Sequence, residues 1–113
     1  MITRIWQAWT TPGNADRYET LLTTQIFPAI RAKGIDGLQE MELLRRTVSS
    51  EVEFVVIFRF ADEASIRRMT GGAAEKAYVP DAARAILKRF EETARHCDRR
   101  AVWTRAREDS HVN

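Results

Sequence analysis

The sequence contains a single cysteine, Cys97, so no disulfide can form within the chain. It lacks any uninterrupted apolar run near the roughly 18 residues of a membrane-spanning helix. The opening residues "MITRIWQAWT" show no cleavable secretory signal, and no linker or internal repeat divides the chain. These absences predict a single cytoplasmic domain over residues 1–105, followed by a polar tail over residues 106–113.

A strong excess of one charge is also absent, because the formal net charge is only +2. Arginines are nevertheless concentrated around Trp103 in the segment "ARHCDRRAVWTRAR", a pattern that admits a nucleic-acid interface. The paired strand aromatics on which RNA-binding sheets stack bases are missing, and Glu40 and Glu42 would repel phosphate. A nucleic-acid partner and a membrane partner are therefore not expected.

What the sequence does have is a regular succession of strand-like and helix-like segments. Asn14 is expected to cap the first helix, and Pro28 predicts a kink within it near Phe27. The predicted elements are a strand over 2–9, a helix over 14–33, a hairpin of strands over 37–46 and 51–60, a helix over 61–72, a helix over 79–92 and a strand over 94–104. This order predicts an α+β fold of the ferredoxin-like βαββαβ type, an antiparallel sheet with helices on one face.

Alternation along the strands assigns side chains to the two faces of the sheet. Phe54, Val56 and Phe58 form a wholly apolar set and are expected under the helices. The opposite face is expected to mix apolar and charged residues, namely Arg4, Trp6, Glu40, Glu42, Val55, Ile57 and Arg59. Such a face predicts a partner subunit that closes over it and encloses a partly polar cavity. On the last strand, alternation directs His96 to this cavity and Cys97 towards the helices.

Three stretches of the chain resemble a known family. The segments "ITRIWQAWTTPGNADRYETLL", "IFPAIRAKGIDG" and "VPDAARAILKRFEETARHC" are similar to the small dimeric α/β-barrel proteins of the antibiotic biosynthesis monooxygenase superfamily, over residues 2 to about 102. The resemblance implies a homodimer of ferredoxin-like subunits packed sheet against sheet, with a small-molecule pocket between the sheet and the helices of each subunit. Some members oxygenate aromatic polyketides without metal or flavin, others degrade haem, and many have no assigned activity.

The resemblance also bears on the type of chemistry. Haem-degrading members use an asparagine on the first strand and a tryptophan and a histidine on the later helical segment. Here the first strand has Gln7, and the segment "IRRMTGGAAEKAYV" has neither Trp nor His, so haem degradation is not expected. The chain has no cluster of His, Cys and carboxylate residues at metal-ligand spacing and no Gly-rich phosphate loop. No metal and no cofactor is therefore predicted.

His96 is the leading catalytic candidate. It shares a strand face with Asp98, and a histidine beside a carboxylate on an enclosed face is suited to act as a general base. The alternative is a structural histidine that bonds a neighbouring backbone or carboxylate group.

Two aromatic residues are candidates for substrate binding. Trp6 is suited to stack on an aromatic substrate, or else to pack in the core or an interface. Tyr78 follows the glycine pair, in a segment suited to a flap over a pocket, and would either donate a hydrogen bond to a ligand or pack as part of the lid.

Four charged residues complete the candidate site. Arg4 and Arg59 are suited to bind a carboxylate ligand. Glu40 and Glu42 share a strand face, either as an acid/base pair or as structural partners in cross-strand ion pairs with these arginines.

Two functional hypotheses follow. The first is an enzyme similar to cofactor-independent monooxygenases that acts on a small aromatic or polyketide-like compound. In it His96 is the base, Trp6 and Tyr78 contact the substrate, and Arg4 or Arg59 stabilises developing negative charge. The second is a non-catalytic, small-molecule-binding or stress-related dimer.

Overall fold

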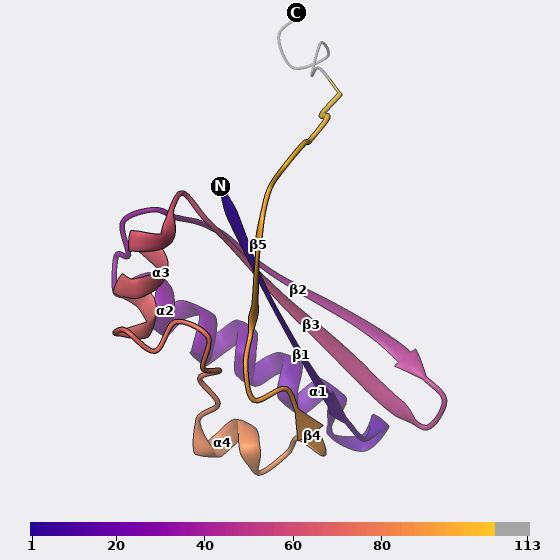
Figure 1. Cartoon of the computed structure of the whole chain (residues 1–113). Coiled ribbons are helices and arrows are strands. Elements are labelled where there is room, and N and C mark those ends of the chain that lie inside the picture. The colour runs from indigo at the N-terminus through magenta and orange to yellow at the C-terminus, as the bar shows by residue number, and fades with distance from the viewer. Residues whose placement is uncertain (106–113) are drawn as a thin grey trace, which may run out of the picture.

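The computed structural model describes residues 1–105, and the tail predicted over 106–113, including His111, lies outside the described residues. Figure 1 shows the arrangement of the elements. The strands are β1 (Ile2–Thr10), β2 (Leu38–Val48), β3 (Glu51–Phe60), β4 (Arg89–Phe90) and β5 (Arg95–Asp98). The helical segments are α1 (Pro12–Leu21), η1 (Leu22–Ile26), α2 (Phe27–Ala32), α3 (Glu63–Thr70) and α4 (Asp81–Arg84). None of the described helices is long and apolar enough to cross a membrane.

The strands form one antiparallel sheet in the order β2-β3-β1-β4, with β5 also paired to β1. The short strands β4 and β5 pair with opposite ends of β1, and the helices lie over one face of the sheet. The predicted α+β ferredoxin-like fold is therefore confirmed.

The first helical stretch begins earlier than predicted and runs through a π-helical segment. Its N-cap is Thr11, with Pro12 directly after it, instead of Asn14, because the fixed φ of proline suits the first helical turn. In a regular α-helix the ring of Pro28 would collide with the carbonyl four residues before it. The π-helical η1 comes just before Phe27 and Pro28 in the chain, and the N–H of Phe27 donates to the carbonyl of Leu22, five residues earlier. This wider turn accommodates the proline at the place where a kink is predicted.

The predicted hairpin and the helix after it form as expected. β2 and β3 pair over nearly their whole length. The side chain of Asp62 caps α3 by accepting a hydrogen bond from the backbone N–H of Ser65 at 2.9 Å. The helix ends at Gly71, whose φ of 73° is the left-handed conformation that glycine adopts at low cost.

The helix predicted over 79–92 is wrong beyond one turn. α4 ends at Arg84, and the chain then pairs with the edge of β1, where the N–H of Lys88 donates to the carbonyl of Trp9 at 2.8 Å. The guanidinium of Arg89 lies 4.0 Å from the centroid of the Trp9 ring. Pairing with a strand edge and this cation–π contact outweigh the helical spacing of the apolar residues.

The strand predicted over 94–104 is shorter than expected. β5 ends at Asp98, which pairs with Ile2, the first residue of β1, so no further residues of that strand remain to pair with. The chain beyond β5 leaves the sheet (Figure 1), and Trp103 is 78% exposed.

The core lies between the sheet and the helices. Its fully buried members include Phe54 and Phe60 of β3, and Tyr18 of α1 packs edge-on against Phe54 with the ring centroids 4.9 Å apart. The prediction that the alternate apolar residues of β3 lie under the helices is correct for Phe54, Val56 and Phe58.

Candidate functional site

The strand register places Arg4 and Trp6 under the helices. Arg4 lies opposite Phe58 and Trp6 opposite Val56 in the antiparallel pair of β1 and β3, and directly opposed residues project from the same face. The prediction that these two residues line the opposite face is therefore wrong. Alternation groups the residues of β1 correctly, but both groups mix polar and apolar residues, so their composition does not identify the helix-facing group.

The same correction applies to β5. His96 lies opposite Arg4 and so shares its face, whereas Cys97 lies opposite Thr3 and is exposed on the open face of the sheet. The prediction that Cys97 points towards the helices is wrong because it depended on the face assigned to β1.

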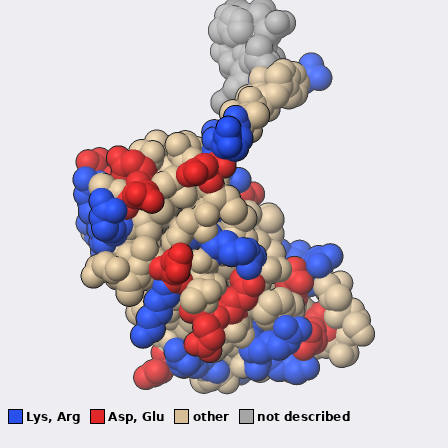
Figure 2. Space-filling model, viewed as in Figure 1, with Lys and Arg blue, Asp and Glu red and all other residues tan. Residues whose placement is uncertain are grey.

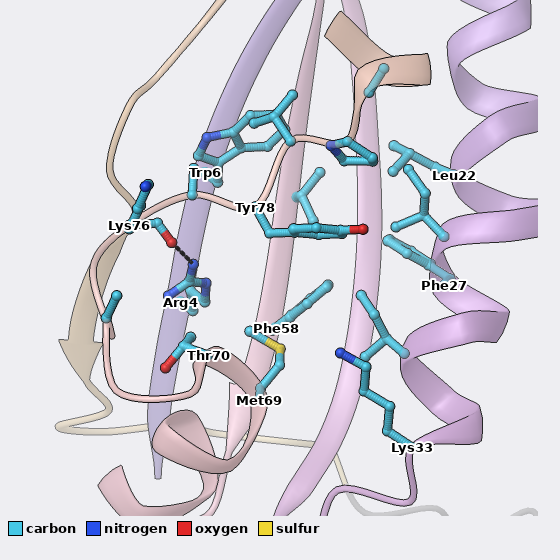
Figure 3. Close-up of a pocket in the computed structure, with 18 of the residues that line it drawn as sticks. Arg4, Trp6, Leu22, Phe27, Lys33, Phe58, Met69, Thr70, Lys76 and Tyr78 are labelled. Carbon is cyan, nitrogen blue, oxygen red and sulfur yellow. Dashed lines mark hydrogen bonds between the residues drawn. The ribbon is translucent and has the colours of Figure 1, made fainter.

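A cavity of about 290 Å³ lies between the sheet and the helices. Most of its lining is apolar or aromatic: Trp6, Tyr18, Leu22, Ile26, Phe27, Ile30, Val56, Phe58, Met69, Ala73, Ala77, Tyr78, Val79, Pro80 and Ala83. Its other lining residues are Arg4, Lys33, Thr70 and Lys76. Figure 3 shows the side chains of the strands, the α1–α2 stretch and the segment after α3 converging on this space.

Arg4 is buried on the sheet side of the cavity and holds the segment after α3 against β1. Its Nη1 donates to the carbonyl of Ala74 at 2.5 Å, and its Nη2 donates to the carbonyl of Lys76 at 3.1 Å (Figure 3). Burial lowers the pKa of Arg4, but a guanidinium stays protonated in proteins, so the cavity wall carries a fixed positive charge.

His96 contacts Arg4 and reaches the cavity only through it. Nη1 of Arg4 lies 2.8 Å from Nε2 of His96, and a guanidinium has no acceptor, so the imidazole accepts at Nε2 and carries its proton on Nδ1. Burial, and secondly the charge of Arg4, lowers the pKa of His96, against the weaker opposing effect of Glu75 and Glu63. The histidine is therefore neutral at pH 7.

The environment of His96 predicts an acid-sensitive fold. Since its pKa is lower in the folded state, the unfolded chain binds more protons below the ordinary histidine pKa, and stability falls as the pH drops through that window. A His96→Gln variant is expected to lose less stability than the wild type between pH 7.5 and pH 5.5, because glutamine keeps an acceptor but does not titrate. Urea unfolding at the two pH values measures the difference. Equal losses in the two proteins would show that the site does not drive this dependence.

The two predicted aromatic candidates both line the cavity. The indole N–H of Trp6 donates to the carbonyl of Glu91 at 2.6 Å, so only its ring is available to a ligand. Tyr78 is 75% exposed and extends across the cavity towards the helix that carries Leu22 and Phe27 (Figure 3). Trp6 therefore forms a fixed part of the cavity wall, and Tyr78 partly covers the cavity.

The other charged candidates lie away from the cavity. Arg59 is on the open face of the sheet, where its Nη1 donates to Glu40 at 3.0 Å and to Glu42 at 3.2 Å. Asp98 is exposed at the end of β5, opposite Ile2. The structure brings together Arg4, Trp6, Tyr78 and His96, but not these residues.

Sequence reasoning missed three polar groups of the cavity. Tyr18 belongs to the apolar stripe of α1 and is typical of a core residue, yet it lines the cavity, and burial raises the pKa of its hydroxyl. Lys33 and Lys76 lie at a helix end and in a loop, where a lysine is ordinary. Only the arrangement in space distinguishes these residues.

Comparisons with known proteins support the fold. No family model and no curated protein matches the sequence. Solved structures do match: PA3566 from Pseudomonas aeruginosa has a TM-score of 0.61 and 22% identity, with 88% of this chain and 94% of that chain covered. A Bacillus cereus protein described as a putative antibiotic biosynthesis monooxygenase has a TM-score of 0.63 and 12% identity, with 92% of this chain and 97% of that chain covered.

A further match is a variant of SnoaB, a cofactor-independent oxygenase from Streptomyces nogalater. It has a TM-score of 0.58 and 17% identity, with 89% of this chain and 95% of that chain covered. At these identities the likeness establishes the fold alone. The expected resemblance to the antibiotic biosynthesis monooxygenase proteins is thus confirmed at the level of the fold.

Proposed function

We propose that the chain is an enzyme similar to cofactor-independent monooxygenases and that it binds a small aromatic or polyketide-like compound in the cavity between sheet and helices. The cavity itself carries this proposal. It has a volume of about 290 Å³, and its lining is mainly apolar and aromatic but includes the buried Arg4. Ligand pockets run from roughly 300 Å³ upward, so this volume suits a compact ligand of fused rings. SnoaB, a cofactor-independent oxygenase, has the same fold, which supports the reaction class.

The chemistry requires a base and a group that stabilises an oxyanion. An activated methylene beside a ring carbonyl loses a proton, and the resulting enolate transfers electrons to O₂. The net change, CH₂ + O₂ to C=O + H₂O, balances without an external reductant. In this proposal Arg4 stabilises the enolate oxygen, and Trp6 and Tyr78 contact the rings.

His96 is the proposed base, and it would act through Nε2. This nitrogen accepts a hydrogen bond from Arg4 in the structure, so a substrate oxygen that takes over that donor would free the lone pair. The lowered pKa of His96 keeps the imidazole unprotonated at pH 7, as a base must be.

Oxygen consumption with a panel of anthrones and naphthols tests this proposal. His96→Ala is expected to lower kcat by about 10²- to 10⁴-fold, the usual contribution of a general base, with little change in substrate binding. Cys97→Ser is the matched control, because this neighbouring side chain projects from the other face of the sheet. Full turnover by His96→Ala rules out the base assignment. Binding without any oxygen consumption by the wild type favours the non-catalytic ligand-binding hypothesis.

We also propose that the chain acts as a homodimer in the cytoplasm. The open face of the sheet carries the half-buried, opposed residues Ile5 and Ile57, and the segment after β5 exposes Trp103. A second copy packed sheet against sheet would cover these apolar groups. The ion pairs of Arg59 with Glu40 and Glu42 lie on the same face and would belong to that interface.

A further inference from the structure

We propose that the cavity selects a ligand bearing an anionic group, a carboxylate or an acidic phenol, and that Arg4 is the residue that confers this selectivity. The inference rests on the proposed function, because it assumes that a small molecule binds in the cavity. It adds the charge class of that molecule.

The charged residues that line the cavity all have the same sign. They are Arg4, Lys33 and Lys76, and no aspartate or glutamate is among the lining residues. On the protein surface seen in Figure 2, acidic and basic side chains are instead interspersed. Figure 3 shows Arg4 and Lys76 on one side of the cavity and Lys33 on the other, so a ligand between them meets positive charge from both sides.

Arg4 is the one of these cations that is buried, at 7% exposure, and its partners are neutral. They are the carbonyls of Ala74 and Lys76 and the unprotonated imidazole of His96. The ion pairs formed within residues 1–105 do not include Arg4. A buried charge without a counter-charge is costly, and an anionic ligand would supply the missing partner.

The guanidinium also has donors to spare. It carries five N–H groups, and its three hydrogen bonds within the described part of the chain use Nη1 twice and Nη2 once. No buried polar side-chain atom in the described part of the chain lacks a partner, so Nε, which has no protein acceptor there, must be open to solvent. An anionic oxygen that replaces this solvent would form a charge-assisted hydrogen bond in a poorly solvated site.

Lys33 and Lys76 have a different role from that of Arg4. Both are exposed, so their ammonium groups remain hydrated and gain less from pairing than a buried guanidinium does. They raise the local concentration of anions at the mouth of the cavity, whereas Arg4 binds the anionic group inside it.

Paired probes that differ only in charge test the inference. With the full-length wild type, 2-naphthoate is expected to bind about 10- to 100-fold more tightly than 2-naphthamide, the range of one charged hydrogen bond. In Arg4→Met this ratio is expected to fall to about 1 because the buried cation is gone. Arg31→Met removes one positive charge from the exposed surface of α2 and should keep the ratio. Isothermal titration calorimetry at fixed ionic strength measures the affinity of each of the three proteins for both probes.

The outcomes separate this inference from the proposed function. If neither probe binds to the wild type up to millimolar concentration, the proposed function is contradicted. If both probes bind with equal affinity, the proposed function stands, but the proposed selectivity for an anionic ligand is wrong. A ratio that survives in Arg4→Met but is lost in the Lys33→Met/Lys76→Met double variant would assign the selectivity to the lysines and overturn the role of Arg4. Where Arg4→Met folds poorly, the wild-type comparison still decides whether the cavity selects an anion, and loss of the affinity ratio in the Lys33→Met/Lys76→Met double variant would still overturn the role of Arg4.

Discussion

Replacing Phe54 by alanine is expected to lower the free energy of unfolding by about 3–5 kcal/mol, the usual cost of deleting a fully buried aromatic ring. Phe54 is 0% exposed, and its ring meets Tyr18 with centroids 4.9 Å apart. It lies on β3, which is paired with β2 on one side and β1 on the other. The backbone therefore cannot move inward to fill the space that the ring leaves. Urea unfolding followed by circular dichroism measures the loss.

Val48→Ala provides the matched control for Phe54→Ala. Val48 lies at the end of the same hairpin and is 40% exposed, so its truncation is expected to change stability by only about 0.5 kcal/mol. Comparable losses for the two variants would mean that the ring of Phe54 contributes no more to the core between the sheet and the helices than an exposed side chain does.

Much of the fold is predictable because local and tertiary preferences agree there. The hairpin of β2 and β3 and the helix α3 follow from alternation, the cap at Asp62 and the stop at Gly71. The agreement fails in the segment after α4. There the apolar residues have helical spacing, but the edge of β1 offers backbone groups to pair with, and the guanidinium of Arg89 contacts the face of the Trp9 ring. These partners are distant in sequence, so a local pattern does not reveal them.

The candidate site was harder to predict than the fold, for a physical reason that Arg4 illustrates. A charged residue on a strand is usually solvent-facing, and this expectation assigns Arg4 to the open face. The structure instead buries it, because two backbone carbonyls and His96 solvate its guanidinium in place of water. These carbonyls belong to a segment some seventy residues away in sequence, as the hydrogen bond from Arg4 to Ala74 shows. The pairing of His96 with Arg4 therefore had no signature in the sequence.

An aspartate in place of Ile57 is expected to convert the proposed homodimer into a monomer. Ile57 lies opposite Ile5 at the centre of the open face and beside Glu42 of β2. A second subunit packed on this face would bury the new carboxylate next to an existing one, at a cost of several kcal/mol per ion. The dissociation constant should rise by at least about 10³-fold, since each 1.4 kcal/mol is a factor of ten. Sedimentation at micromolar concentration should give twice the chain mass of 13.0 kDa for the wild type and the single chain mass for the variant.

Ile57→Thr separates the effect of charge from that of a lost side chain. Threonine keeps the β-branched shape that suits a strand but adds no charge, so a weakened dimer is expected to persist at higher concentration. Circular dichroism should show native secondary structure in both variants, because Ile57 projects away from the core beneath the helices. A wild-type mass of 13.0 kDa contradicts the dimer itself. A dimeric Ile57→Asp variant would instead move the interface off the centre of the open face, and the exposed Trp103 would then be the next residue to replace.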